Sequence, residues 1–448
     1  MGDKLAVLKS PAPEGMPDDP WARMADILAE IRAPEFPTRV FDITDYGARG
    51  EADCTAAFAS AIAACFTAGG GRVLVPPGDW FSGAIHLRSN VELHLAEGAA
   101  IRFNRDPGAY LPLVRTRWEG TELLNYSSFV YAFAQRNIAI TGKGILDGQA
   151  DEDHWWNWDK LLRARGKASA RHRLHVMNDE NTPVAERLFG EGAFLRPNLI
   201  TFFRCENVLL EDVTLLRSPM WQIHPLESDN IVIRRVTMEA SGPNTDGCDP
   251  ESSTNVLIED CSFNTGNDCI AVKSGRNDDG RMVMLPAKNL IVRRCQFRDG
   301  HGGVTLGSEI AGGVRNVFVE DCQIDSPNLR SALRIKNNAK RGGEIEHVHW
   351  RRVRIGRVNA AILQIDYHYE EGSEGVYVPS VRHVHLEQIS CEQCPRVAEI
   401  HGYENAVIAA VVMKDCAFSN VGRRSIVKGD EDPVLENVTV NGRLVDAI

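Results

Sequence analysis

Polar side chains suited to acid–base chemistry gather in four segments in the second half of the chain. Asp246 stands in SGPNTDGCDPESS, and Asp268 follows in FNTGNDCIAVKSGRNDDGR. His301 lies in RDGHGGVTLGSE, and Arg334 and Lys336 lie in ALRIKNNAKRGG. Carboxyl groups and an imidazole can transfer protons, and a pair of cations can hold an anion. Because aspartate and asparagine beside glycine are also common in turns, this chemistry requires the four segments to lie together in the fold.

A strand pattern that recurs through most of the chain predicts such a fold. Each copy begins with Asn, His or Ala and continues for about six residues with alternating apolar side chains, which is typical of a β-strand. Copies start at Asn90, Asn137, Asn207, Asn230, Asn255, Asn289, Asn316, His347, His383 and Ala410. From Asn207 onward the starts are 23 to 36 residues apart, so the loops vary in length. This irregular repeat predicts an all-β solenoid, a right-handed parallel β-helix.

Cysteines occupy one position of the repeat. Cys261, Cys295, Cys322 and Cys416 share a register, and we expect them to form an internal ladder of small apolar side chains. The chain has 11 cysteines, an odd number spread over a long sequence, so it is not a disulfide scaffold. We interpret the single CxxC at Cys391 as packed thiols.

The sequence outside the repeat predicts the remaining organisation. Residues 1–36 form an N-terminal tail with a helical patch, which we expect to dock on the end of the solenoid. We expect residues 37–448 to form the β-helix domain that carries the candidate site. Within it, residues 53–68 have the composition of an apolar helix, the expected short N-terminal cap over an open solenoid core. Residues 150–196 interrupt the repeat with tryptophans and basic residues, and we expect this insertion near the functional cleft.

The solenoid would bring the two aspartates together. Asp246 and Asp268 are 22 residues apart, close to one turn, so stacking places them side by side on one face. Their segments also hold Asp249, Asn267 and Lys273, which we include among the candidate site residues.

The four segments resemble the ordered signatures of the polygalacturonases, glycoside hydrolase family 28. The matching motifs are NTDG (244–247), NDC (267–269), GHG (300–302) and RIK (334–336). Other segments, including HWW, SPMWQIHP and the SGRNDDGR stretch, look most like bacterial exo-acting members. The resemblance implies a right-handed parallel β-helix and hydrolysis with inversion at the anomeric carbon, with no metal or other cofactor.

The resemblance also implies roles for individual residues. Asp246 and Asp268 would orient and deprotonate the attacking water, and His301 would support them through hydrogen bonds. Arg334 and Lys336 would bind the galacturonate carboxylate.

Other residues are expected to contact the substrate. Tyr367, in QIDY, matches a tyrosine that lines the sugar subsite in the family, although Tyr369 lies nearby. Asp249 and Lys273 are expected to bind substrate as well.

One position departs from the family pattern. The family usually has two adjacent aspartates before the cysteine, and the first is assigned as the general acid; here it is Asn267. An amide cannot donate a proton as an acid near neutral pH. Asp268 could be the acid with Asp246 as the base, or Asp249 or Glu309 could have taken the role. The protein could also be impaired or repurposed.

The predicted function is an exo-acting polygalacturonase that releases terminal galacturonate, with the 150–196 insertion blocking one end of the groove. One alternative is hydrolysis of another uronate polymer such as rhamnogalacturonan. A second is a pectin-binding β-helix without catalysis, which Asn267 supports. A third is a pectate-lyase-like enzyme, which commonly needs a calcium site.

Composition limits the partners. The 448 residues carry 50 Lys+Arg and 61 Asp+Glu, a formal charge of −11, which argues against general binding to nucleic acid or anionic membranes. No stretch approaches the ~20 apolar residues of a membrane span. The first residues lack signal-peptide features, yet a pectic substrate favours a periplasmic or secreted protein over a cytoplasmic one. The sequence does not indicate an oligomeric state.

Overall fold

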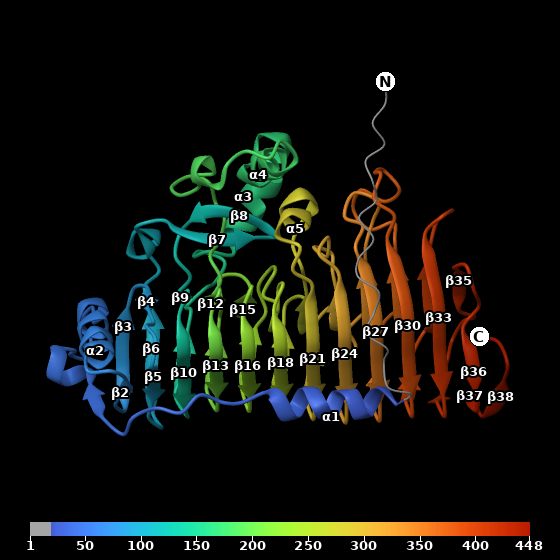
Figure 1. Ribbon diagram of the computed structural model, residues 1–448, viewed down its shortest axis with the longest axis horizontal. Coiled ribbons are helices and arrows are strands. Elements are labelled where there is room, and N and C mark those ends of the chain that lie inside the picture. Colours follow the sequence, from blue (N-terminus) through green and yellow to red (C-terminus); the bar gives the residue numbers. More distant parts are fainter. Residues whose placement is uncertain (1–18) are drawn as a thin grey trace.

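The computed structural model describes residues 19–448, which form a right-handed parallel β-helix, as the sequence predicts. Three long sheets run along the molecule, and each coil contributes a strand to them in turn (Figure 1). Equivalent strands of successive coils pair in parallel, so every strand except those at the ends of a sheet has a neighbour on both edges. The connections between parallel strands have the usual right-handed sense.

The strand bounds follow the repeat. Sheet 1 contains β1 (Val40–Asp42), β2 (Gly71–Val75), β5 (Val91–Leu95), β10 (Arg136–Gly142), β13 (Glu206–Glu211), β16 (Asp229–Arg234), β18 (Thr254–Glu259), β21 (Ala287–Arg293), β24 (Val314–Glu320), β27 (Glu344–Arg351), β30 (Ser380–Glu387), β33 (Val407–Lys414) and β36 (Val434–Glu436). Sheet 2 contains β3 (Gly78–Ser82), β6 (Ala99–Phe103), β11 (Ile145–Asp147), β14 (Thr214–Leu216), β17 (Thr237–Ala240), β19 (Ser262–Thr265), β22 (Gln296–Asp299), β25 (Gln323–Ile324), β28 (Arg354–Arg357), β31 (Ser390–Gln393), β34 (Ala417–Phe418), β37 (Val438–Val440) and β38 (Arg443–Val445).

Sheet 3 is divided into two parts. The first contains β4 (Ile85–His86), β9 (Val130–Phe133), β12 (Ile200–Phe203) and β15 (Ile223–Leu226). The second contains β20 (Ile270–Val272), β23 (Gly302–Leu306), β26 (Ser331–Lys336), β29 (Ala361–Asp366), β32 (Arg396–His401) and β35 (Ile426–Lys428). The coil between them contributes only isolated bridges, through Cys248 and Glu251. The candidate site lies at this interruption.

Asparagine recurs in the repeat because of its backbone conformation and its side chain. Near the start of successive sheet 1 strands, Asn207, Asn230, Asn255 and Asn289 have φ of 55–58°. Asparagine tolerates this left-handed region better than most residues. The amides also form a ladder: Asn230 donates to Asn207 at 2.7 Å, and Asn289 donates to Asn255 at 2.9 Å. The sequence repeat therefore marks where each coil turns into sheet 1.

The cysteines of the repeat face the interior. Cys261, Cys295 and Cys322 are each about 1% exposed and lie in the main core with Cys416. All 11 cysteines are free and buried. The prediction of an internal ladder is confirmed.

The N-terminal helix α1 (Pro20–Glu30) does not dock on the end of the solenoid, so that prediction is wrong. It lies along the outer face of sheet 1, beneath the middle coils in Figure 1. Its buried residues Met24 and Ile27 pack on outward-facing apolar side chains, one from each of several strands. These are Ala139, Leu209, Val232, Leu257, Ile291 and Phe318. A row of apolar residues on the outside of sheet 1 would otherwise be exposed to water. The helix packs on this row and covers it.

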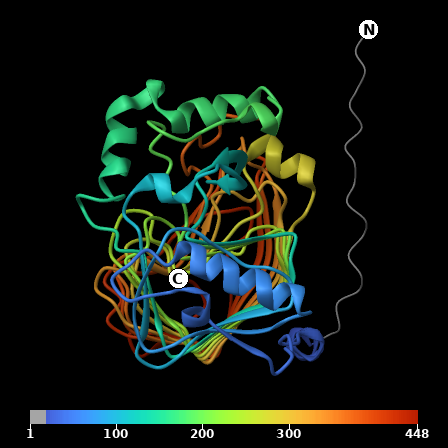
Figure 2. The same cartoon turned by 90° about the vertical axis from the view of Figure 1, so that its left-hand side faces the viewer.

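Helix α2 (Thr55–Thr67) lies across the N-terminal end of the β-helix. Figure 2, which looks at this end, shows it over the stacked coils. Phe58, Ile62 and Cys65 are buried and join the main core. The helix thereby shields the apolar interior of the first coil from water.

The insertion forms a second layer above the coils. It contains α3 (Asn157–Arg165) and α4 (Ala170–Asp179), which lie over the antiparallel hairpin β7 (Val114–Trp118) and β8 (Thr121–Asn125) (Figure 2). Leu162 and Leu174 from the helices share a small core with Trp118 and Trp221. Trp156 anchors the insertion, because its Nε1 donates to the Ser218 carbonyl at 2.9 Å.

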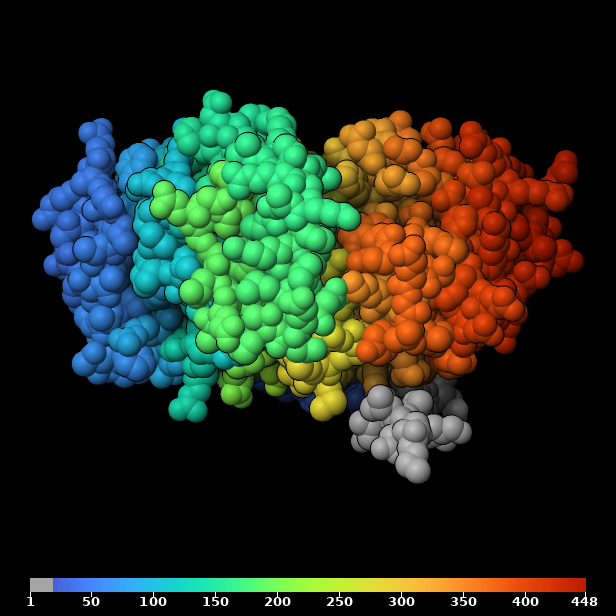
Figure 3. Space-filling view, turned by 90° about the horizontal axis from the view of Figure 1, so that it is seen from above, coloured from blue at the N-terminus to red at the C-terminus, as the bar shows by residue number. Residues whose placement is uncertain are grey.

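Short helix α5 (Asn277–Val283) completes this layer. Asp279 of α5 accepts from Arg187 of the insertion at 2.6 Å and from the Glu122 amide of β8 at 2.8 Å. In the view from above, the green insertion faces the orange segments of residues 340–380 across the top of the molecule (Figure 3). Four 3-10 turns, Ile43–Tyr46, Pro107–Tyr110, Gly166–Ala168 and Val184–Glu186, account for the other helical segments among residues 19–448.

Candidate active site

The stacking of the coils brings Asp246 and Asp268 to equivalent positions. Cys248 bridges Ile223 and Ile270, which places these three residues in one row with their side chains in the core. Asp246 and Asp268 each precede a member of this row by two residues. Their separation in sequence is thus one turn of the β-helix, and both carboxyl groups are buried, at 2% and 0% exposure.

A chain of hydrogen bonds links three of the predicted residues. Asn267 Nδ2 donates to Asp246 Oδ1 at 3.0 Å. Its Oδ1 lies 2.7 Å from His301 Nδ1, which donates to it because the amide nitrogen is already used on Asp246. Burial lowers the pKa of His301 and outweighs the opposing effect of Asp268, so the imidazole is neutral near pH 7. Asn267 therefore holds Asp246 in place and connects it to the exposed histidine.

Asp268 is surrounded by the predicted cations. Lys336 Nζ donates to its Oδ2 at 2.8 Å, and Arg334 Nη1 lies 3.8 Å from its Oδ1. Gly302 of the GHG motif lets the backbone approach, since a Cβ there would lie 2.8 Å from Asp268 Oδ1. The NDC, GHG and RIK motifs thus meet at one carboxylate.

The two aspartates have opposite electrostatic environments. Burial, with the nearby charge of Asp268, raises the pKa of Asp246 to about 7, although Lys273 and Lys336 oppose this. Burial also acts to raise the pKa of Asp268, but Lys336 and Arg334 outweigh it and hold the pKa below its ordinary value. A pair with one protonated and one ionised member is the arrangement that acid–base hydrolysis needs.

Two further carboxyl groups, named in sequence as alternative acids, have different surroundings. Asp249 is 0% exposed and both of its oxygens lack hydrogen-bond partners, and burial raises its pKa well above the ordinary value. Burial acts to raise the pKa of Glu309 as well, but Lys273, Arg276 and Arg341 hold it well below its usual range. Glu309 is therefore ionised and poorly suited to donate a proton.

Lys273 is placed differently from a substrate-binding lysine. Its Nζ donates to Glu309 at 2.9 Å and to the Gly307 carbonyl at 3.3 Å, and it lies 4.7 Å from the centre of the Trp221 ring. The ammonium is thus occupied by the protein itself. Lys273 lines the inner cavity, but its contacts indicate a structural and electrostatic role.

The prediction for Tyr367 is wrong, and Tyr369 takes its place at the cleft. Tyr367 is fully buried, and its hydroxyl donates to the Val407 carbonyl at 2.7 Å. Tyr369 lines the cleft, with Lys336 Nζ 5.2 Å from its ring centre. Tyr367 follows β29 directly and joins the core with it, whereas Tyr369 lies two residues farther along the loop.

Two connected cavities lie above the aspartates. The inner cavity, about 70 Å³, is lined by residues that include Asp246, Asn267, Lys336 and Glu309. The outer cavity, about 580 Å³, is lined in large part by the insertion, including Leu162, Ser169, His172 and His175. The insertion thus borders the cleft at one end.

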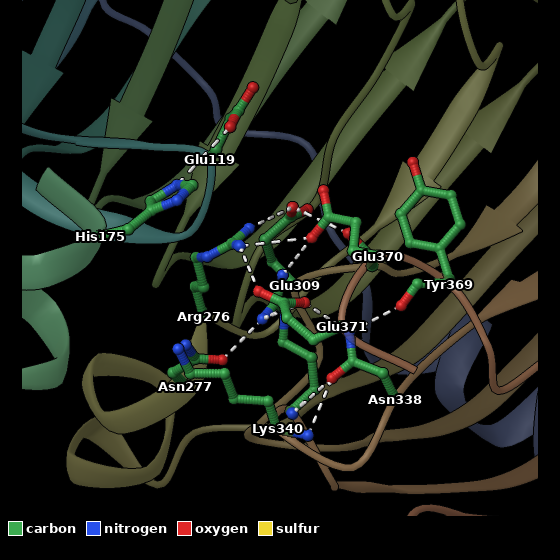
Figure 4. Close-up of polar contacts among 12 residues, drawn as sticks. Glu119, His175, Arg276, Asn277, Glu309, Asn338, Lys340, Tyr369, Glu370 and Glu371 are labelled. Carbon is green, nitrogen blue, oxygen red and sulfur yellow. Dashed lines mark hydrogen bonds and ion pairs between the residues drawn. The ribbon is translucent and has the colours of Figure 1, made fainter. Parts of the chain in front are cut away.

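A network of ion pairs surrounds the outer cavity, and the sequence did not reveal it. Figure 4 shows the guanidinium of Arg276 facing a group of three carboxylates, Glu309, Glu370 and Glu371. Arg276 Nη2 lies 3.3 Å from Glu370 and 3.1 Å from Glu371. Glu119, in the β7–β8 turn, accepts from Arg171 of α4 at 2.7 Å. These residues come from loops far apart in the chain and outside the repeat, so no spacing signal connected them.

Within residues 19–448, no group of three or more His, Cys, Asp or Glu side chains is arranged to hold a metal ion. No helix in that part of the chain is long and apolar enough to cross a membrane.

Comparisons with known proteins agree with the geometry. Residues 191–441 match the model of the glycosyl hydrolases family 28. A probable polygalacturonase of Vitis vinifera is 31% identical over 69% of this chain and 59% of its own length. An exo-poly-alpha-D-galacturonosidase of Dickeya chrysanthemi is 28% identical over 75% of this chain and 58% of its own length. The chain thus spans less than three fifths of these two relatives.

Solved structures agree as well. A hyperthermoactive exopolygalacturonase from Thermotoga maritima has a TM-score of 0.90 and 39% identity, covering 95% of this chain and 97% of that one. A polygalacturonase from Erwinia carotovora shares the fold, with a TM-score of 0.67 and 22% identity over 92% of this chain and 98% of that one. From the motifs, the β-helix and these matches, the chain belongs to family 28 of the glycosyl hydrolases.

Proposed function

We propose that this protein is an exo-acting polygalacturonase that hydrolyses terminal α-1,4-linked galacturonate from pectic polymers or oligomers with inversion. The observation that carries the proposal is the pair of buried aspartates with opposite charge states beside Arg334 and Lys336. This pair supplies an acid and a base, and the cations supply a site for a uronate carboxylate.

In the proposed reaction, Asp246 is the general acid. It lines the inner cavity and is protonated up to about pH 7, so it can donate its proton to the glycosidic oxygen as the bond to C1 breaks. Asp268 is the base and takes a proton from the water that attacks C1 from the opposite face. The products are galacturonate of inverted configuration and a shortened chain with a new terminal hydroxyl.

This assignment reverses the roles that the sequence favoured for the two aspartates. Asp268 remains paired with Lys336 and Arg334, and a carboxylate held by cations is a poor acid. A substrate carboxylate that binds Lys336 would draw this cation from Asp268 and free an oxygen for the water. Asn267 then positions Asp246 through its amide hydrogen bond and does not donate a proton.

Exo action is supported by the insertion at one end of the cleft. Its helices line the outer cavity, where they would obstruct the passage of an internal chain segment. The similarity to the Thermotoga maritima exopolygalacturonase extends over 95% of this chain, so it includes at least part of the insertion. Since pectic polymers are extracellular, we propose a periplasmic or secreted location.

The stereochemical outcome tests the proposal. Proton NMR during hydrolysis of trigalacturonate should show the β-anomer of galacturonate first, before mutarotation produces the α-anomer. Initial formation of the α-anomer, or of an unsaturated product that absorbs in the ultraviolet, would contradict inverting hydrolysis. Binding without turnover would instead favour the pectin-binding alternative that Asn267 raises.

A further inference from the structure

The inner and outer cavities are adjacent. Five residues line both of them: Glu119, Arg171, Asn244, Tyr369 and Glu370. They come from the β7–β8 turn, helix α4, the coil of Asp246 and the loop after β29. The inner cavity, about 70 Å³, is well below the ~300–1,000 Å³ typical of small-molecule sites. The inner cavity is thus too small for a sugar, and residues that border it must move before a sugar can reach Asp246.

Arg171 differs from the other cations of the outer cavity. Arg276 is 3% exposed at its side chain and contacts Glu309, Glu370 and Glu371. Arg171 is 37% exposed at its side chain. Of the cationic side chains in residues 19–448, Arg171 alone lines both cavities. It is the accessible positive charge at the entrance to the catalytic aspartates.

The contacts of Arg171 leave part of its guanidinium open. Nε donates to Glu119 at 2.7 Å, but Nη2 is 3.6 Å from Glu370, beyond hydrogen-bond distance. Glu370 also has Arg276 at 3.3 Å and Arg341 at 2.6 Å. Because these two cations remain, Glu370 can lose Arg171 without becoming an unpaired charge. An incoming carboxylate can thus replace Glu370 beside Arg171 at a low cost in free energy.

We propose that Arg171 binds the carboxylate of the terminal uronate, which replaces Glu370 and competes with Glu119 for the guanidinium. The planar fork of arginine suits a bidentate carboxylate contact. This inference rests on the proposed function, because it assumes a uronate substrate. It makes Arg171 a specificity-determining residue that selects a free acid over a methyl-esterified terminal sugar.

Binding calorimetry tests the proposal separately from catalysis. All variants are made in the full chain with Asp246→Asn to prevent turnover, and the probes are digalacturonate and digalacturonate that is methyl-esterified at the terminal sugar only. Arg171→Met should weaken digalacturonate binding roughly tenfold to hundredfold, as expected for a lost charge-assisted contact. The methyl ester should bind both proteins weakly and alike. Glu370→Gln should bind digalacturonate at least as tightly as the parent, because a competitor is removed.

Arg173→Met is the matched control. Arg173 lies on the same helix, is exposed, and rests over Phe189 outside both cavities. Its substitution should leave the affinity unchanged. Because Arg171→Met leaves Glu119 without its closest cation, the double variant with Glu119→Gln shows whether any loss of binding comes from misfolding. It should fold and still bind digalacturonate weakly.

The proposal is overturned if Arg171→Met binds digalacturonate as tightly as Arg173→Met does. It is also overturned if the Asp246→Asn parent binds the ester and the acid equally, or if this parent binds neither probe. Hydrolysis by the unmodified protein is measured in parallel. Binding that depends on Arg171 without hydrolysis would refute the proposed function and support this inference. Hydrolysis with binding independent of Arg171 would do the reverse.

Discussion

At the scale of single residues, the central feature is a buried pair of aspartates that differ in charge. Asp246 is protonated up to about pH 7, because burial and the neighbouring charge of Asp268 disfavour its ionised form. Asp268 stays ionised because Lys336 and Arg334 overcome the effect of burial. In the proposed reaction, the asparagine at position 267 changes the source of the proton but leaves a site with one acid and one base.

The pH dependence of catalysis follows from this difference. An acid must be protonated to act, so kcat/KM should fall about tenfold per unit as pH rises above about 7. A base must be ionised, so kcat/KM should also fall at low pH, where Asp268 becomes protonated. Because the pKa of Asp268 is depressed, this acidic limb should lie below ~3.9, the ordinary pKa of an aspartate. Initial rates on trigalacturonate from pH 3 to 9 measure both limbs. A rate that stays constant up to pH 9 would exclude Asp246 as the acid.

Lys273 affects the pKa of Asp246, and its substitution should change both the pH dependence of catalysis and the stability of the protein. Lys273→Met removes a positive charge that lowers the pKa of Asp246, so the alkaline limb should move up by roughly one pH unit. It also leaves Glu309 without its 2.9 Å partner, at a cost of about 3–5 kcal/mol in the free energy of unfolding.

Adding Glu309→Gln separates the two effects of Lys273. The double variant should regain much of the stability in denaturant unfolding, because the carboxylate that lost its closest cation is gone, while the shifted pH limb persists. A limb that stays near pH 7 in both variants would show that Lys273 acts only on stability.

At the scale of elements, helix α1 shows what the sequence could and could not predict. The helix itself was predictable from its pattern, but its apolar face does not specify which surface covers it. The partner is a row of outward-facing residues such as Val232 and Leu257, whose register becomes visible only when the coils stack. The helix therefore covers the flank of the solenoid and not its end.

Docking of α1 should be independent of catalysis. Ile27→Asp places a charge in a contact where Ile27 is 1% exposed, so α1 should detach and its amides should exchange rapidly with deuterium. We expect kcat/KM to change less than about twofold, since α1 and the insertion that lines the outer cavity lie on opposite sides of the β-helix (Figure 1). Ala25→Asp, on the exposed face, is the control and should keep slow exchange. Loss of activity in parallel with detachment would contradict this separation.

The insertion is held by Trp156, and loosening it should change the products. The indole donates to Ser218, and a Cβ at Gly242 would lie 2.2 Å from the ring, so the two surfaces are in close contact. Trp156→Ala should let the insertion move and open the blocked end. Digalacturonate and longer oligomers should then appear among the early products of polygalacturonate.

The control for the insertion is Trp156→Phe, which keeps a ring at this position but loses the hydrogen bond. It should release mainly galacturonate, as we expect of the unmodified protein. If Trp156→Ala also releases only the monomer, the insertion does not determine exo action. Product sizing by anion-exchange chromatography distinguishes these outcomes.

At the scale of the whole molecule, the stacked repeat explains why much of the fold was predictable. Asparagines such as Asn207 and Asn230 mark the start of sheet 1 strands through a left-handed backbone and a shared hydrogen bond. Asp246 and Asp268 are 22 residues apart, which is one turn of the β-helix, so their proximity could be inferred from this separation in sequence. The ion pairs of Arg171 could not, because the loops that form them follow no period.

The burial of Tyr367 also could not be predicted from the sequence. A motif match identified QIDY, but only the packing of the chain after β29 decides that Tyr367 is buried and Tyr369 faces the cleft. The charges of the aspartates also depend on burial and on Lys336, which lies 68 residues from Asp268 in sequence. Such effects require the three-dimensional arrangement.

The most direct test of the account is the size of the products over time. The unmodified protein and Asp246→Asn are incubated with polygalacturonate, and products are sized from the earliest time points. The account predicts free galacturonate as the first and dominant product of the unmodified protein, and a rate about 10²–10⁴-fold lower for Asp246→Asn. A ladder of oligomers before any monomer, or an Asp246→Asn variant of undiminished rate, would contradict it.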